Sequence, residues 1–163
     1  PFATIARSGN IELRKLDESV PVSIESGLSV TPFAVSHRNE LSETVGFLLS
    51  SDDKELIYLP DIDSWEGFES DIKSMISSSS VALIDGTFYS GSELGHRDMS
   101  RVPHPPISSS MRMLSDIDRS DRGKVYFTHL NHTNPAMDPA SSEARAVTDG
   151  GFNIAVDRQG FAL

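Results

Sequence analysis

The stretch that most constrains the fold is residues 124–139, KVYFTHLNHTNPAMDP. Its apolar run, residues 125–127, leads to His129 and His132 in a segment of Asn, Thr and Pro that cannot continue a strand. Buried strands that end in polar, histidine-bearing loops are where α/β proteins place ligands and metals. The stretch therefore predicts a strand followed by a functional loop.

Two earlier stretches repeat this arrangement. Residues 28–35 (LSVTPFAV) lead into His37, and residues 56–59 (LIYL) lead into Asp61. Together with His129, these side chains provide imidazole and carboxylate groups, which suit zinc, iron or manganese. We therefore predict a metal site with His37, Asp61 and His129 as ligands, although polar strand ends that hold no metal would show the same spacing.

Three residues are predicted to act in catalysis: Asp61, His104 and His132. A carboxylate such as Asp61 can bridge two metal ions and stabilise a metal-bound hydroxide. His104 lies in a long aperiodic loop, residues 90–106, of a length that is more often functional than accidental. In extended chain His132 and His129 point to opposite sides, so His132 is expected to contact substrate or else to be a solvated loop histidine.

Four further polar residues are predicted to contact substrate or to support the ligands: Asp63, Asp85, Thr87 and Asn131. Asp63 has a simpler alternative role, since an acidic side chain stabilises the N-terminus of a following helix. Asp85 and Thr87 belong to the segment Asp-Gly-Thr at the end of an apolar run, which an ordinary tight turn would also explain.

The hydrophobic pattern predicts an α/β layer, because strands and helices alternate in the second half of the chain. The expected strands are residues 11–16, 20–24, 28–35, 44–49, 55–59, 81–84, 124–127 and 152–156. The expected helices follow a Ser64 cap, begin at Pro106, and run from the Asp138 cap to about Val147. Pro32 predicts an edge position or a bulge in its strand.

The composition of the 163 residues narrows the possible partners. One domain is expected for this length. The net charge of −10 argues against a nucleic acid or an anionic membrane as the main partner, and favours a small-molecule substrate. The chain has no cysteine, which leaves only His, Asp and Glu as metal ligands and fits a reducing, cytoplasmic compartment. No apolar run approaches the roughly 20 residues of a membrane span.

Several stretches together resemble the metallo-β-lactamase superfamily, and within it the branch of pyrroloquinoline quinone (PQQ) biosynthesis protein B. They are FAVSHRNELSETVGFLL (33–49), LIYLPDIDSW (56–65), ALIDGTFYSGSEL (82–94), PHPPI (103–107) and FTHLNHTNP (127–135). The resemblance implies an αββα sandwich with the metal site at one edge between two sheets. It identifies His37 with an isolated histidine ligand, Asp61 with the carboxylate that contacts or bridges the metals, and His129 with the last histidine ligand.

The superfamily's H-x-H-x-D-H ligand motif has no match in this chain. The chain therefore resembles the C-terminal half of such a sandwich, with an incomplete ligand set for one or two zinc or iron ions. A half sandwich would leave a sheet face uncovered, which favours association with another copy.

Three functions remain open on the sequence alone. The first is a metal-dependent enzyme similar to PQQ biosynthesis protein B. The second is a hydrolase of phosphodiesters or other esters, and the third is a non-catalytic fragment that binds a partner.

Overall fold

A seven-stranded sheet forms the centre of the computed structural model, which describes residues 2–35, 44–95 and 103–163. The strands follow chain order across the sheet: β1 Val22–Glu25, β2 Leu28–Ala34, β3 Val45–Ser50, β4 Glu55–Leu59, β5 Val81–Asp85, β6 Val125–Thr128 and β7 Asn153–Ile154. Strands β1 to β4 are antiparallel, and β4 to β7 are parallel. The predicted α/β class is confirmed.

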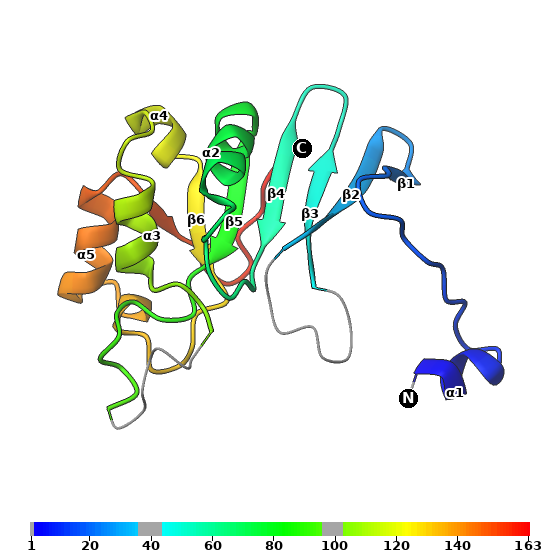
Figure 1. Ribbon diagram of the computed structural model, residues 1–163, viewed down its shortest axis with the longest axis horizontal. Helices are drawn as coiled ribbons and strands as arrows, with labels where there is room; N and C mark the ends of the chain where they lie inside the picture. The colour runs from blue at the N-terminus through cyan, green and yellow to red at the C-terminus, as the bar shows by residue number, and fades with distance from the viewer. Residues whose placement is uncertain (1, 36–43, 96–102) are drawn as a thin grey trace.

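The helices gather beside the parallel strands, and the N-terminal helix lies apart from them (Figure 1). They are α1 Phe2–Arg7, α2 Glu69–Ser78, α3 Ile107–Met113, α4 Arg119–Arg122 and α5 Ser142–Asp149, with a 3₁₀ turn, η2, at Pro135–Met137. None of the helices in these described ranges is both long and apolar enough to span a bilayer.

One face of the sheet makes the core with α2 and α3. Alternate strand residues are wholly buried there, among them Ile57, Ile84 and Phe127, because successive side chains of a strand point to opposite faces. Trp65 is also in the core, and its indole N–H donates to the buried Ser110 hydroxyl at 2.8 Å. Full burial of side chains of this size contributes about 1.5–3 kcal/mol each.

The opposite face is only partly covered. Its register partners Tyr58, Leu83 and Tyr126 lie on adjacent strands, and Tyr58 is exposed. The C-terminal segment passes over this face: the Phe161 ring packs edge-on against Tyr126 with centroids 5.0 Å apart. Helices α2 and α3 therefore cover one side of the sheet, and the apolar residues of the other side are only partly covered.

Two predicted strands are wrong in type or extent, and two short helices were missed. Residues 11–16 form no strand, because the alternating pattern has no neighbouring strand with which to pair in the part of the chain that the structure describes. The strand predicted at residues 152–156 has only two paired residues, those of β7. The short helices α1 and α4 were not predicted.

Two helices begin later in the sequence than predicted. Helix α2 begins at Glu69, since the Ser64 hydroxyl accepts only a turn-like hydrogen bond from the Glu66 N–H. Helix α5 begins at Ser142, where Ser141 is the N-cap and accepts from the Ala144 N–H at 2.9 Å. In each case the polar residue suited to a cap begins a turn that precedes the helix instead.

Pro32 does not place its strand at the edge, since β2 pairs on both sides. The ladder with β1 begins at Val30, so at Pro32 that side of β2 has no strand partner. The Pro32 carbonyl accepts instead from the Ser19 N–H of the preceding loop at 2.8 Å. The missing N–H of proline therefore costs no ladder hydrogen bond.

Candidate metal centre

The parallel strands bring three of the predicted site residues together at the end of the sheet where these strands finish, which we call the C-terminal edge. Asp61, Asp85 and His129 come at or just after the C-terminal ends of β4, β5 and β6. The register pairs Leu59 with Ile84 and Asp85 with Thr128, so these ends are level. Ligand sites of parallel sheets lie at this edge.

Asp85 is the centre of the polar network and is fully buried. Its Oδ1 accepts from the Thr87 N–H at 2.9 Å and from the Thr87 hydroxyl at 2.8 Å. Its Oδ2 accepts from the Ile62 N–H at 3.1 Å and lies 2.7 Å from Nδ1 of His104. Four donors thus occupy the four lone-pair positions of an ionised carboxylate.

His104 lies between two acidic residues. Its Nδ1 is 2.7 Å from Asp85 and 3.5 Å from Oδ1 of Asp61. Burial alone would lower the pKa of His104, but the hydrogen bond to Asp85 and the negative charge of Asp85 act in the opposite direction. The charges of Asp61 and Asp63 add to them, so the pKa of His104 is raised above its ordinary value.

Thr87 connects the two histidines. Its hydroxyl oxygen is 3.0 Å from Nδ1 of His129 and 3.2 Å from Nδ1 of His104. The single hydroxyl proton is donated to Asp85, so toward the imidazoles this oxygen can only accept. The network therefore assigns the proton of a neutral His129 to Nδ1 and leaves its Nε2 as the atom with a free lone pair.

Both histidines have backbone conformations that are uncommon outside glycine. The φ angle is 87° at His104 and 61° at His129. Such conformations cost free energy and concentrate at functional sites, where neighbouring contacts hold them in place.

The contacts that hold the His129 loop come from the turn after β5. The Asn131 N–H donates to the Thr87 carbonyl at 3.0 Å. The buried Asn134 amide donates to the carbonyls of Gly86 at 2.8 Å and Thr87 at 3.3 Å, and its oxygen accepts from the Ala136 N–H at 2.9 Å. These bonds join the turn and the His129 loop into one unit.

Gly86 and Asn134 were not among the predicted site residues. A Cβ atom at Gly86 would lie 2.8 Å from Cβ of Phe127 and 3.1 Å from the Thr128 carbonyl, so only glycine permits this approach of β5 and β6. Each had a sequence signal, the glycine of Asp-Gly-Thr and the turn-forming pair Asn134–Pro135.

The structure places the other predicted residues as follows. The His and carboxylate cluster with ligand atoms within 4.8 Å of one another, among the described residues, is Asp85, His104 and His129. Asp63 is half-buried near His104, whereas His132 is exposed and outside this cluster. The Asn131 side chain donates to the Thr133 hydroxyl at 2.7 Å. His37 lies outside the described residues.

Comparison with known proteins identifies the family. The family model for the β-lactamase superfamily domain matches residues 1–130. A coenzyme PQQ synthesis protein B of Methylorubrum extorquens is 27% identical over 95% of this chain and 55% of that protein. The protein of the same name from a Methylobacterium species is 30% identical over 87% of this chain and 52% of that protein. The chain thus spans about half the length of the curated relatives it matches.

Solved structures agree on the fold. Zn²⁺-bound PqqB from Methylobacterium extorquens superimposes with a TM-score of 0.76 at 24% identity, covering 92% of this chain and 55% of that one. An isothiocyanate hydrolase from Delia radicum gut bacteria superimposes with a TM-score of 0.65 at 13% identity, covering 99% and 63%. The chain therefore belongs to the metallo-β-lactamase superfamily, in which it is similar to PQQ synthesis protein B.

Proposed function

We propose that this chain supplies part of a divalent-metal centre in an enzyme that is similar to PQQ synthesis protein B. We further propose that this enzyme acts on a small molecule. The observation that carries the proposal is the meeting of Asp61, Asp85, His104 and His129 at one sheet edge. The Zn²⁺ named for the similar PqqB structure supports a divalent metal as the ion that this chain would help to bind.

The donor set fits a divalent metal such as zinc or iron. Imidazole nitrogens and carboxylate oxygens are ordinary ligands of both. Asp85 already accepts four hydrogen bonds, so it is better suited to orient a histidine than to bind the ion directly. We assign His129 and Asp61 as ligands, together with His37 on the basis of the family resemblance.

Thr87 and Asp85 would prepare the histidines for this role. The Thr87 hydroxyl fixes the Nδ1 proton of His129, which leaves Nε2 for the metal. Metal-binding histidines commonly donate their second ring N–H in this way, and the contact fixes both tautomer and ring orientation.

When bound, the metal would supply Lewis acidity and lower the pKa of a water ligand. His104 would hold and release a proton beside it, because the hydrogen bond to Asp85 and the nearby carboxylates favour its protonated form. Asp85 keeps the imidazole of His104 in place through the 2.7 Å hydrogen bond.

Hydrolysis is a second candidate, and the Asp85–His104 pair is the observation that favours it. A hydrolase must protonate its leaving group, and a histidine held by a buried carboxylate is suited to do so. Zinc has no redox chemistry and would serve hydrolysis, whereas iron would serve an oxidative step.

Metal analysis of the purified chain tests the site. We expect zinc or iron to bind stoichiometrically, and we expect His129→Ala and His37→Ala to weaken binding at least tenfold. His132→Ala is the matched control, since this exposed loop histidine lies outside the cluster. A chain that binds no metal, or binds it equally well in all three variants, would leave only the partner-binding alternative.

The two chemistries need separate assays on the full-length protein. Oxygen consumption with the iron-loaded enzyme, and no turnover of ester or phosphodiester substrates with zinc or manganese, would support the oxidative reaction. The reverse result would support hydrolysis.

A further inference from the structure

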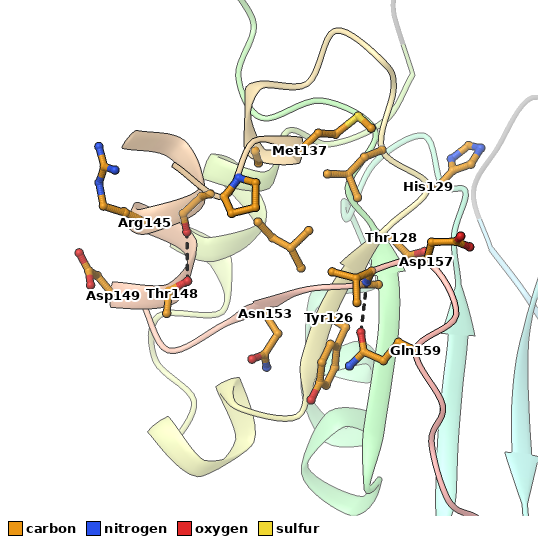
Figure 2. A pocket seen from close by; sticks show the side chains of 17 residues that line it. Tyr126, Thr128, His129, Met137, Arg145, Thr148, Asp149, Asn153, Asp157 and Gln159 are labelled. Carbon is orange, nitrogen blue, oxygen red and sulfur yellow. Dashed lines mark hydrogen bonds between the residues drawn. The ribbon is translucent and has the colours of Figure 1, made fainter. Parts of the chain in front are cut away.

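Different contacts orient the side chains of the metal centre. The imidazole of His129 lies at one end of a cavity lined by β6, β7 and α5, and it points away from the middle of this cavity (Figure 2). The contact that orients this ring is the Thr87 hydroxyl, 3.0 Å from Nδ1. Asp61 and His104 lie on two separate segments of chain, so their spacing depends on how these segments are joined.

A buried hydrogen bond joins the two segments. Trp65 belongs to the Asp61 segment, between β4 and α2, and Ser110 lies on α3, which directly follows the His104 segment. The indole N–H of Trp65 donates to the Ser110 hydroxyl at 2.8 Å. Trp65 is 6% exposed and Ser110 is fully buried within an apolar core. A satisfied polar pair in such surroundings favours a single arrangement of the elements that it joins.

One end of this hydrogen bond is connected stiffly to His104. Pro105 and Pro106 separate His104 from α3, and the ring of each proline restricts its φ angle to about −65°. The first turn of α3 is fixed in turn by the Ile107 N–H, which donates to the Phe88 carbonyl at 2.8 Å. The position of α3 therefore determines where the His104 ring lies.

The other end is connected to Asp61. Ile62 is fully buried, and its N–H donates to Asp85 at 3.1 Å, so the Asp61 segment is held at Ile62 and again at Trp65. The Phe68 N–H donates to the Trp65 carbonyl at 2.8 Å and closes the turn before α2. A different seating of Trp65 would therefore move the Asp61 carboxylate relative to α3.

The distances around His104 show why this spacing matters. Oδ1 of Asp61 is 3.5 Å from Nδ1 of His104, whereas Oδ2 of Asp85 is 2.7 Å from the same atom. The Asp61 side chain is 38% exposed, and the Asp85 side chain is inaccessible to solvent. Asp61 can therefore face an ion while His104 stays bound to Asp85, provided that the two segments keep this separation.

We propose that Trp65 and Ser110 are positioning residues of the metal centre, whose hydrogen bond sets the separation between Asp61 and His104. This inference rests on the proposed function, in which Asp61 binds the ion and His104 holds a proton. Neither Trp65 nor Ser110 is assigned a contact with the ion. Loss of their hydrogen bond should weaken metal binding although every ligand is still present.

Three variants test the hydrogen bond. Trp65→Phe removes the donor, Ser110→Ala removes the acceptor, and the double variant removes both. We expect each single variant to weaken zinc binding roughly threefold to tenfold, measured by competition with a chelator. The double variant should lose little more than either single variant, because all three lack the same bond.

Ile76→Val is the matched control for general destabilisation. Ile76 is fully buried on α2, so this substitution should lower stability to unfolding but leave zinc affinity unchanged. Urea unfolding shows that each variant is folded and gives its stability.

A second measurement does not depend on the metal. The imidazole ¹⁵N signals of His104, recorded in EDTA at one pH, report the hydrogen bonding of this ring. We expect both single variants to shift these signals and to leave those of the exposed His132 in place, whereas Ile76→Val should shift neither. If the parent chain binds no zinc, the proposed function fails, and the metal-free signals still decide whether the hydrogen bond positions His104.

Three outcomes would overturn the proposal. The first is unchanged His104 signals in both single variants. The second is a zinc affinity that follows unfolding stability alone, with Ile76→Val included. The third is a double variant whose loss of affinity is the sum of the two single losses, because Trp65 and Ser110 would then act independently.

Discussion

Nδ1 of His104 lies 2.7 Å from Oδ2 of Asp85, and the Asp85 side chain is wholly inaccessible to solvent. A buried carboxylate is unfavourable unless its hydrogen-bonding positions are filled, and here four donors fill them. The hydrogen bond between Asp85 and His104 therefore has two effects. It helps to stabilise the buried carboxylate, and it fixes the orientation of the His104 ring.

Asp85→Asn is expected to destabilise the fold by about 1–3 kcal/mol, because an NH₂ group would replace an acceptor that faces only donors. Urea unfolding measures the loss, and Asp53→Asn, at an exposed turn, should change stability little. Asp85→Asn should also lower the pKa of His104, which an NMR titration of the ring protons of His104 measures. An unchanged pKa would show that Asp85 does not hold this imidazole.

The raised pKa of His104 gives stability a definite dependence on pH. Protonation of His104 favours the folded state, so this contribution is complete below the unfolded pKa, about 6.5 for histidine. It is lost as the pH rises through the higher folded pKa. The difference in unfolding free energy between the parent chain and His104→Gln should shrink over that range, and a difference that grows with pH would contradict the assignment.

Thr87→Val should weaken metal binding by about 10–100-fold, because it removes the acceptor that fixes the tautomer of His129. Thr87→Ser keeps the hydroxyl and should restore most of the affinity. Competition with a chelator measures both values. Equal affinities for the two variants would mean that the hydroxyl does not position the ring.

Asn134→Ala should cost about 1–3 kcal/mol of folding stability, since the Gly86 carbonyl and the Ala136 N–H lose their buried partner. Asn131→Ala in the same loop is the control, because the Asn131 side chain donates to the Thr133 hydroxyl at an exposed position. Chemical denaturation compares the two variants. An equal loss of folding stability in both variants would contradict the role assigned to the buried Asn134 side chain.

The sequence determined the strands and the polar groups that follow them. Apolar runs such as residues 56–59 and 125–127 are long enough to be buried, and the residues after them cannot continue a strand. That was enough to place Asp61, Asp85 and His129 at strand ends. It failed for residues 11–16, because a strand also needs a neighbour with which to pair, and no local pattern supplies one.

Only the tertiary structure decided which of these groups meet. The level register of β4, β5 and β6 sets the relative heights of Asp61, Asp85 and His129, and the loop carrying His104 returns to them from far along the chain. In our proposal, the four hydrogen bonds to Asp85 favour a role in orienting His104 over a role as a metal ligand. The contacts of Thr87 with His104 and His129 join residues that are 17 and 42 positions apart in the chain. Such contacts depend on the directions of the side chains, which residue spacing does not determine.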